Sequence, residues 1–414
     1  MSIGEASHIR ETICSLRIAF LAMGGQDWTA GPIYLSNMFY ALRQTYGRRL
    51  KFYLLAPANY GDIRTYAHSI EPDGVVPYDM PQSWTALWVI DRLCQRLLSR
   101  EILVERVLNK HGIDVVFGYK LGYKYRKKAV LSWLPDFQHL HLPEMFSKAE
   151  RLSRDRAYLR STRLSDRVIV ANESARKDFE AFAPTFAYKV KALHPITHVP
   201  ADLYKCNLDS ILRLYGLPEK FVYLPNQFWK HKNHEIAFKA LRVLGDRSIK
   251  AIIVCTGLPS DPRDPTHFPL LWQKLSVWNV REQVIYLGLI PREHVLQLMR
   301  QCICVLNPSL FEGWGISVDE ARSVGKQLLL SDIPSHREHS PPKAVFFDPH
   351  SYNDLAEKLG QIWVSTKPGP DLQLELEAQQ SLSGRLRVYA EGFMSVVHEA
   401  IQEARKRHSR SVAR

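Results

Sequence analysis

The segment richest in residues that could do chemistry runs from Asn307 to Glu338, where a loop joins a buried apolar run to a helical pattern. The loop contains Glu312, Gly313 and Gly315, and Ser317 follows at the predicted start of the helix. Glycines let a ligand approach the backbone, and the first amide groups of a helix point outward without helical partners. We therefore predict an anion site here that suits a diphosphate.

Two carboxylates, Glu312 and Glu320, lie before and after this predicted anion site. Carboxylates in such places can accept hydrogen bonds from sugar hydroxyls. Glu320 has an alternative role, because Ser317 to Glu320 is also a capping-box sequence in which the glutamate closes the helix start. For Glu312 the alternative is an exposed loop carboxylate. The residues alone leave these alternatives open.

A second candidate is a basic loop in the stretch Tyr223 to Leu241, where Lys230, His231 and Lys232 precede a helical pattern. A lysine at such a place can neutralise the charge that builds on a departing diphosphate. Taken by themselves, three basic residues in a row are more typical of a solvated loop than of a phosphate site.

The elements that must position these residues alternate along the whole chain, since short aliphatic runs are separated by helical patterns. Helices that alternate with strands are typical of parallel α/β sheets. The predicted strands lie at residues 16–22, 50–56, 113–118, 129–134, 167–171, 220–225, 250–257, 283–288, 302–308, 326–332 and 344–347.

The runs fall into two complete α/β units, and the Pro-containing stretch 193–208 has no clear period, as expected of a linker. We predict an N-terminal domain at 1–195, a C-terminal domain at 205–385, and a C-terminal helix with a basic tail at 386–414 that crosses back to the first domain. Ligands bind beyond the carboxyl ends of parallel strands, so two such sheets would face a central cleft.

The Asn307–Glu338 segment closely resembles the signature of retaining glycosyltransferase family 4, whose fold is GT-B with two Rossmann-like, doubly wound α/β domains. The matching residues are Pro308, Ser309, Glu312, Gly313, Gly315, Glu320, Ala321 and Gly325. The resemblance implies that residues 1–195 form the acceptor-side domain and residues 205–385 the nucleotide-sugar-binding domain. It implies that Glu312 contacts the donor sugar and Glu320 the nucleotide ribose. It also implies that the backbone after Gly315 contacts the diphosphate.

The stretch from Tyr223 resembles the family's lysine-led helix near the donor phosphates, with Lys232 on the family's lysine. The family often has an arginine five positions earlier, where this chain has Gln227. That departure leaves phosphate binding one cation short unless Lys230 or a residue elsewhere compensates. Gly288 and Leu289, in a third similar stretch, are expected near the nucleotide base.

The N-terminal half matches the family less well. Gly24, Gly25 and Gly31 resemble a glycine-bearing loop facing the donor phosphates, but they are not the GxGxxG fingerprint of dinucleotide binding. Asp136 matches the family's aspartate in Trp133 to Ser147. The main departure from the family in this stretch is Pro135, which stands where the family has its active-site histidine. His139 or His141 could supply an equivalent group.

The complete site that the resemblance implies has a catalytic and a donor-binding part. The catalytic set is Glu312, Lys232, Asp136 and His139. The donor-binding set is Glu320, Gly313, Trp314, Gly315, Ile316, Ser317, Gln227, Lys230, Gly288, Leu289, Gly25 and Gly31. No Asp-x-Asp motif and no histidine-rich cluster occurs, so we expect neither a metal nor a cofactor.

Composition limits the classes of protein. The apolar fraction of 46% and charged fraction of 23% are those of a globular chain. There is no apolar run long enough to cross a bilayer and no signal-peptide pattern at the start, so we expect a cytoplasmic protein. Six scattered cysteines suggest neither disulfides nor a zinc site.

The net charge of +13 favours polyanionic binding partners. Arg92, Arg96 and Arg100 recur every four residues, and the basic residues of 120–128 alternate with tyrosines, a pattern that suits an anionic membrane surface or a lipid-diphosphate acceptor. The alternative is a solvated face.

We therefore expect a retaining, metal-independent hexosyltransferase. It would use a UDP-, GDP- or dTDP-linked donor and a saccharide or lipid-linked acceptor, in glycan or polysaccharide biosynthesis. It would be peripheral to the inner face of the cytoplasmic membrane if it binds lipid. Two alternatives remain, a noncatalytic nucleotide-sugar-binding protein and a basic nucleic-acid-binding protein. No nucleic-acid module is present, so nucleic acid is not an expected partner.

Overall fold

The computed structural model of the chain describes residues 16–24, 30–58, 71–78 and 85–412. Gly25 lies outside these described residues. The chain forms two compact units, and each has its own parallel sheet. Unit 1 comprises Met1–Phe137, Lys148–Ile196 and Gly384–Arg414, and unit 2 comprises Gln138–Ser147 and Thr197–Ser383. Residues 138–147, which the sequence ranges include in the first domain, thus group with unit 2.

The described residues of unit 1 form a seven-stranded sheet in the order β3-β2-β1-β4-β5-β6-β7, with every neighbouring pair parallel. Its strands are β1 (Arg17–Leu21), β2 (Lys51–Pro57), β3 (Gly74–Tyr78), β4 (Val115–Tyr119), β5 (Ala129–Leu134), β6 (Arg167–Val170) and β7 (Val190–Ala192). Its helices include α2 (Ala30–Tyr46), α4 (Ala86–Leu97), α5 (Ile102–Lys110), α7 (Lys148–Leu164) and α8 (Glu173–Phe182). All six residues of β5 are buried, as expected for a strand covered on both faces.

Unit 2 contains a six-stranded parallel sheet in the order β10-β9-β8-β11-β12-β13. Its strands are β8 (Val222–Leu224), β9 (Ile253–Cys255), β10 (Val284–Tyr286), β11 (Cys304–Asn307), β12 (Leu328–Ser331) and β13 (Ala344–Phe347). Its helices include α6 (Gln138–His141), α9 (Leu208–Tyr215), α10 (His234–Asp246), α11 (His267–Val277), α12 (Arg292–Gln301), α13 (Ile316–Ser323), α14 (Pro334–His339) and α15 (Tyr352–Ser365). This is the doubly wound order of a Rossmann-like domain.

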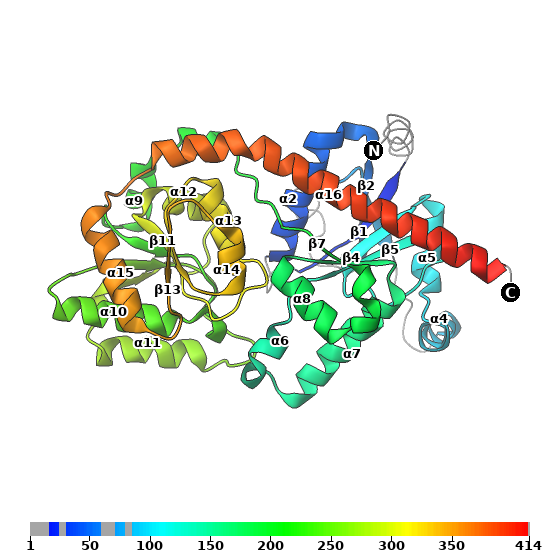
Figure 1. Ribbon diagram of the computed structural model, residues 1–414, viewed down its shortest axis with the longest axis horizontal. Coiled ribbons are helices and arrows are strands. Elements are labelled where there is room, and N and C mark those ends of the chain that lie inside the picture. Colours follow the sequence, from blue (N-terminus) through cyan, green and yellow to red (C-terminus); the bar gives the residue numbers. More distant parts are fainter. Residues whose placement is uncertain (1–15, 25–29, 59–70, 79–84, 413–414) are drawn as a thin grey trace. The chain divides into compact units, whose positions relative to one another are not determined.

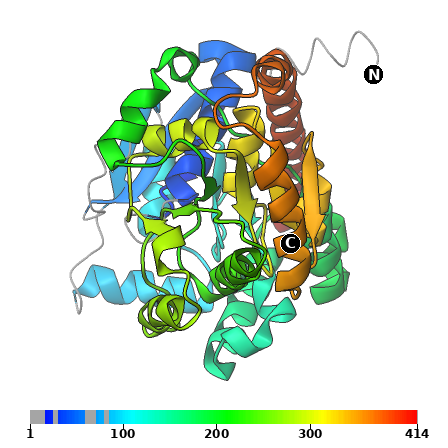
Figure 2. The same ribbon diagram turned by 90° about the vertical axis from the view of Figure 1, so that its left-hand side faces the viewer.

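Alternate residues of the unit 2 strands face two separate cores. Val222 and Leu224 pack with α10, α11 and α15, whereas Tyr223 between them packs with α9, α12 and α13. Figures 1 and 2 show these two groups of helices on opposite faces of the sheet. Two buried faces explain why the strands appear in the sequence as continuous apolar runs.

The sequence predicted eleven of these strands at their observed places and missed β3 and β7. β3 is an edge strand with the sequence GVVPY, and Pro77 is tolerated there because an edge strand has one side without ladder bonds. β7 is also an edge strand and has only three residues. Edge strands of this kind lack the apolar run on which the prediction relied.

The chain ends in one long helix, α16 (Leu372–Val412), which starts earlier than the predicted 386. Its residues up to Ser383 belong to unit 2, and those from Gly384 belong to unit 1. Among the described residues, no helix is both long and apolar enough to pass through a membrane.

Candidate functional site

Two loops of unit 2 meet where the strand order reverses. β8 and β11 are neighbours and parallel, so the loops that follow them leave from the same edge of the sheet. The backbone joins these loops directly, because the Leu310 amide donates to the His231 carbonyl at 2.8 Å. In open α/β sheets this switch point is where ligands bind.

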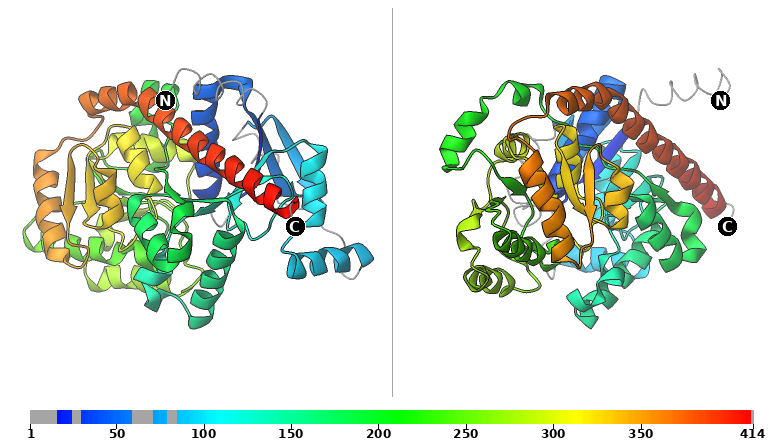
Figure 3. Two further views of the ribbon diagram at one scale, coloured as in Figure 1. Left: turned by 45° about the vertical axis from the view of Figure 1, so that its right-hand side comes forward. Right: turned by 60° about the vertical axis from the view of Figure 1, so that its left-hand side comes forward.

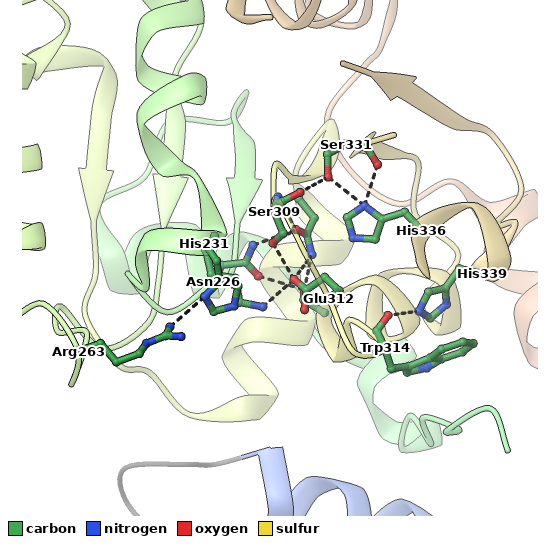
Figure 4. Close-up of polar contacts among 12 residues, drawn as sticks. Asn226, His231, Arg263, Ser309, Glu312, Trp314, Ser331, His336 and His339 are labelled. Carbon is green, nitrogen blue, oxygen red and sulfur yellow. Dashed lines mark hydrogen bonds and ion pairs between the residues drawn. The ribbon is translucent and has the colours of Figure 1, made fainter. Parts of the chain in front are cut away.

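The carboxylate of Glu312 is the centre of a dense polar cluster in these loops (Figure 4). Its Oε1 accepts from Lys232 Nζ at 2.6 Å, from the Ser309 hydroxyl at 2.6 Å and from Asn307 Nδ2 at 3.4 Å. The Glu312 side chain is 7% exposed and that of Lys232 is 16% exposed. The predicted alternative of an exposed loop carboxylate is therefore wrong.

Electrostatics keep Glu312 ionised. Burial by itself raises the pKa of a carboxyl group, but the Lys232 cation, together with the charge that His336 and His231 acquire in acid, outweighs it and holds the pKa of Glu312 at about 2. The site thus carries a buried ion pair at neutral pH. For Lys232, the alternative of a solvated basic loop is therefore wrong.

Two asparagines and a serine connect the ion pair to the start of α13. Asn226 Nδ2 donates to Asn307 Oδ1 at 3.2 Å, and the Ser317 hydroxyl donates to Asn226 Oδ1 at 3.1 Å. Asn307 Nδ2 also donates to the Ser317 hydroxyl oxygen at 3.3 Å. Because each side chain has at least two partners, the β8 loop, the β11 loop and the helix start are held in one geometry.

Gly315 is the residue that allows the loop to enter α13. Its φ is +91°, in the left-handed region that favours glycine, and it is the N-cap of the helix. Its carbonyl accepts from the amides of Val318 and Asp319. The helix therefore starts at Ile316, and its first amides are directed toward the loop that holds Gly313, as an anion site requires.

The capping-box alternative for Ser317 and Glu320 is wrong. Ser317 lies inside the first turn and bonds the asparagines instead of capping the helix. Glu320 accepts from Arg292 Nε at 2.9 Å, and Arg292 also donates from Nη2 to the His198 carbonyl. The Glu320 carboxylate is 7% exposed and held in place by a partner that the sequence did not indicate.

Lys230 forms its ion pair with Asp264, at 3.9 Å, and not with Glu312. It lines a separate pocket of about 450 Å³ near α10 and α11, together with residues such as His234 and Lys274. Gln227, which stands in the family's arginine position, is half-buried.

Arg263 is a cation beside the β8 loop that the sequence gave no reason to single out. It donates from Nη2 to His231 Nδ1 at 3.2 Å and from Nε to the buried Asp261 at 3.2 Å. Since arginine can only donate, Nδ1 of His231 is the acceptor and the ring proton lies on Nε2. Burial, followed by the charge of Lys232, lowers the pKa of His231 well below its ordinary value, so this ring is neutral.

Two further buried histidines lie behind the glycine loop. His336 Nδ1 is 2.9 Å from the Ser331 carbonyl, and His339 Nε2 is 2.7 Å from the Trp314 carbonyl. Each of these nitrogens must be the donor, because a carbonyl only accepts. Burial lowers the pKa of both rings to about 4. They support the loop as neutral donors, and Trp314 itself is buried against His339.

Gly288 and Leu289 follow β10, next to β9 in the sheet order, and Leu289 is 58% exposed. Gly288 has a φ of +74°, and its carbonyl accepts from the Gly257 amide. An exposed apolar side chain at this edge can cover a flat ring, so their expected place near a base stays a prediction.

The predicted residues of the first half fall in different units. Asp136 belongs to unit 1, where its Oδ1 accepts from Arg154 Nη1 at 3.2 Å. Gly31 is also in unit 1, and a Cβ there would lie 2.5 Å from the Met23 carbonyl oxygen, so its close packing on the backbone that follows β1 explains this glycine without a ligand.

The two candidate histidines of the Pro135 region belong to unit 2. The His139 side chain is 1% exposed and lies edge-on to Phe146. His141 is exposed, and its ring lies 5.2 Å from that of Phe311 in the β11 loop. His141 is therefore the one that neighbours the glycine loop.

The structure thus brings together Glu312, Lys232 and the α13 start, and adds Asn226 and Arg263 to them. Asn226 could have been noticed, because it precedes the basic loop directly after a strand. Arg263 lies in a proline-rich stretch without any pattern. Among the described residues, no group of three or more His, Cys, Asp or Glu side chains is placed to hold a metal ion.

The glycine loop and the basic loop both lie in a stretch that matches a known family. Residues 214–368 match the family "Glycosyl transferases group 1". The chain is a glycosyltransferase. No curated protein sequence matches this glycosyltransferase at a significant level.

Solved structures resemble the glycosyltransferase over almost its full length. HepE of Anabaena, in complex with UDP and glucose, is 17% identical with a TM-score of 0.61, and the match covers 95% of this chain and all of that one (100%). A glycosyltransferase from Rickettsia africae is 12% identical with a TM-score of 0.64, covering 95% and 99%. WaaG, involved in lipopolysaccharide biosynthesis, is 17% identical with a TM-score of 0.55, covering 90% and 95%. The fold is accordingly GT-B.

Proposed function

We propose that the protein is a retaining, metal-independent hexosyltransferase that moves a sugar from a nucleotide-sugar donor to a saccharide or lipid-linked acceptor. The observation that carries the proposal is the ion pair of Lys232 and Glu312 beside the start of α13, at the switch point of the unit 2 sheet. It puts a cation, a carboxylate and outward-directed amides within one small loop cluster, which is what a sugar diphosphate needs.

The reaction follows from these groups. The bond between the anomeric carbon and the diphosphate oxygen breaks, and Lys232 with the first amides of α13 stabilises the negative charge on the leaving diphosphate. The acceptor hydroxyl forms its new bond from the same face and gives its proton to a leaving phosphate oxygen. Glu312 contacts the sugar and Glu320 the ribose. Neither Glu312 nor Asp136 acts as a covalent nucleophile, and His139 has a supporting role at most.

The donor class to test first is UDP-linked, ahead of GDP- and dTDP-linked sugars, because HepE, which shares the fold, was solved with UDP and with UDP-glucose. WaaG's part in lipopolysaccharide biosynthesis supports a glycan acceptor and a role in polysaccharide biosynthesis. We infer that Arg263, which donates to the neutral His231 next to Lys232, supplies the cation that the Gln227 position lacks.

We place the reaction in the cytoplasm, at the inner face of the cytoplasmic membrane. The described cysteines Cys94, Cys206, Cys255, Cys302 and Cys304 are all free thiols, which suits a reducing compartment. The excess of positive charge favours a surface of anionic lipids.

The test is a thermal-shift and calorimetric titration of the protein with UDP, GDP and dTDP and their hexose derivatives, in the presence of a chelator. It is repeated with Lys232→Gln and with the matched control Lys274→Gln, whose lysine pairs with Glu235 at 2.8 Å on the surface. We expect one nucleotide to stabilise the wild type, and Lys232→Gln to weaken its binding by about tenfold or more because a charge-assisted contact is lost. Lys274→Gln should bind like the wild type.

The same variants are then assayed for release of nucleoside diphosphate with and without acceptor glycans. Binding without any release or transfer would support a noncatalytic sugar-nucleotide sensor. If every nucleotide leaves the melting temperature of the folded protein unchanged, the proposal loses its basis.

A further inference from the structure

Helix α4 of unit 1 buries polar side chains and exposes apolar ones, which is the reverse of an ordinary surface helix. The side chains that it buries are polar, Asp91 and Gln95, which bond each other at 2.7 Å. Tyr123 donates to Gln95, and the Arg160 guanidinium donates to its backbone carbonyl. A helix of a globular protein normally buries its apolar face and exposes its polar one.

The apolar side chains of α4 are instead exposed. The exposed fractions are 46% for Leu87, 39% for Val89, 54% for Ile90, 50% for Leu93 and 78% for Leu97. Val89, Leu93 and Leu97 are spaced by four residues and therefore form one stripe along the helix, with Ile90 beside it. Figure 3 shows α4 at the margin of unit 1, projecting beyond the strands of its sheet.

Charges around this stripe are sorted by sign. Arg92 and Arg96, one turn apart, are exposed beside the apolar stripe. In the following segments the carboxylates face inward: Glu105 is 4% exposed, and Glu101 accepts from the Tyr125 hydroxyl at 2.6 Å. Burial raises the pKa of Glu101 to about 7, so its negative charge is reduced near neutral pH.

Further cations extend the same region. Arg106 and Lys110 on α5 and Arg126 and Lys127 in the loop before β5 are exposed. The loop lies against the end of α4, because the Lys124 amide donates to the Ser99 carbonyl at 2.8 Å. The third arginine of the sequence repeat is an exception. Arg100 lies beyond the end of α4 and pairs with Glu105 at 2.6 Å, so the predicted stripe has two arginines and not three.

We propose that α4 is an interfacial helix that inserts its apolar stripe, Val89, Ile90, Leu93 and Leu97, into an anionic lipid bilayer while Arg92 and Arg96 contact the lipid phosphates. An outward apolar stripe flanked by arginines is the combination that binds in the plane of an anionic membrane. A solvated face would be polar throughout. A protein partner of complementary shape would not need the surrounding cations.

This inference deepens the membrane part of the proposed function and names the surface responsible. It concerns unit 1, whereas donor binding rests on unit 2, so the two can be tested separately. An acceptor in a lipid layer would then be met by an enzyme already held at that layer.

The test is sedimentation of the full chain with phosphatidylcholine vesicles that do or do not contain phosphatidylglycerol. We expect binding to the anionic vesicles only, falling as salt is raised because the arginine charges are screened. Leu93→Ser with Leu97→Ser should weaken binding about tenfold or more, because two leucine side chains no longer leave water. Arg92→Gln with Arg96→Gln should weaken it about fivefold per arginine and flatten the salt dependence.

The matched control is Val277→Ser with Val364→Ser, which removes two side chains that are 76% and 74% exposed on unit 2. This control should bind vesicles like the wild type. All variants should keep the wild-type melting temperature and nucleotide response, since every replaced side chain is exposed. A failed vesicle test with an intact nucleotide response would therefore refute this inference alone.

Three results would overturn the inference. The first is wild-type protein that ignores anionic vesicles, and the second is binding that the α4 variants leave unchanged. The third is self-association in analytical ultracentrifugation that Leu93→Ser with Leu97→Ser abolishes, because the stripe would then cover a second copy of the chain.

Discussion

Gly325 lies directly against the backbone of Glu375, so that a Cβ at Gly325 would come within 2.3 Å of the Glu375 amide nitrogen. Gly325 ends α13 with a φ of +68°, and Glu375 is in the first turn of α16. The helix that carries Glu320 is thus fixed at its far end by the beginning of the C-terminal helix. No side chain larger than hydrogen fits between them.

We predict that Gly325→Ala destabilises the protein by about 3 kcal/mol or more, because left-handed strain and a backbone clash add. Gly216→Ala is the matched control: its φ is +61°, but nothing lies within 4 Å of the added Cβ. It should cost only the strain, about 1 kcal/mol. Urea unfolding measures both losses, and equal losses would show that the close approach to Glu375 has no effect.

The same turn of α16 carries a buried ion pair. Arg300 donates to Glu375 from Nε at 2.6 Å and from Nη2 at 3.1 Å, and from Nη1 to the Leu203 carbonyl at 2.7 Å. Both side chains are at most 6% exposed. Removing one member leaves a buried charge without its counterion.

A double-mutant cycle tests this pair. Arg300→Met alone and Glu375→Leu alone should each destabilise the protein by about 3 to 5 kcal/mol, and the double variant should lose much less than the sum. The surface pair Lys343 and Asp371, with both side chains at least 31% exposed, should couple by less than about 1 kcal/mol. Additive losses for the buried pair would contradict the prediction.

The sequence was sufficient for the framework of the site and insufficient for its partners. The buried strands and the glycine loop were predictable, because two-sided burial gives continuous apolar runs and Gly315 must occupy a left-handed turn. The partner of Glu320 was not predictable: Arg292 is 28 residues away in the chain and meets Glu320 only through the packing of α12 beside α13. Arg263 reaches His231 from a loop on another strand for the same reason.

The sequence also did not predict the exposed apolar stripe of α4, because only the arginine repeat of this helix was considered. The repeat of Arg92 and Arg96 was visible, but its apolar residues could equally have been core. The structure shows that these apolar residues are not core, since Asp91 and Gln95 face inward while Leu93 faces solvent. Which face of an amphipathic helix is covered depends on contacts that a periodic pattern does not contain.

His339 should make stability depend on pH. Burial lowers its folded pKa to about 4 from 6.5, so between these values the unfolded chain takes up a proton that the folded chain refuses. Its contribution is fully present above pH 6.5 and is lost as pH falls toward 4. Going from about pH 7 to about pH 5, the wild type should lose about 2 kcal/mol that His339→Gln does not lose. Urea unfolding of both proteins at the two pH values measures this difference, and parallel losses would contradict it.

Glu312 should contribute in a lower pH window. Its folded pKa of about 2 is below the ordinary 4.5, so its stabilisation is present above pH 4.5 and declines as pH falls through about 2. At neutral pH this amounts to about 3 kcal/mol at most. Between about pH 5 and pH 3.5 the advantage of the wild type over Glu312→Gln should shrink by about 1 kcal/mol. Guanidinium unfolding at both pH values checks the change, and an advantage independent of pH would mean that Glu312 is not held ionised.

Glu312→Gln should also separate donor binding from transfer. In the free enzyme the Glu312 carboxylate pairs with Lys232 at 2.6 Å. When Lys232 binds the donor phosphates, as proposed, the negative charge of Glu312 would lie close to them. Removing that charge should leave nucleoside-diphosphate affinity unchanged or raise it, because Lys232 no longer has a competing anion. Transfer should fall on the order of a hundredfold, because the contact to the reacting sugar is lost.

The readouts are calorimetric affinity for the nucleoside diphosphate and initial rate of nucleotide release. Glu235→Gln is the matched control, since Glu235 pairs with Lys239 at 2.6 Å on the surface of α10 and should change neither quantity. If Glu312→Gln loses affinity and rate together, the carboxylate holds Lys232 in its binding position and does not act on the sugar. If Lys232→Gln loses affinity while Glu312→Gln keeps it, the two members of the pair have the separate roles in phosphate and sugar binding that their places in the loops predict.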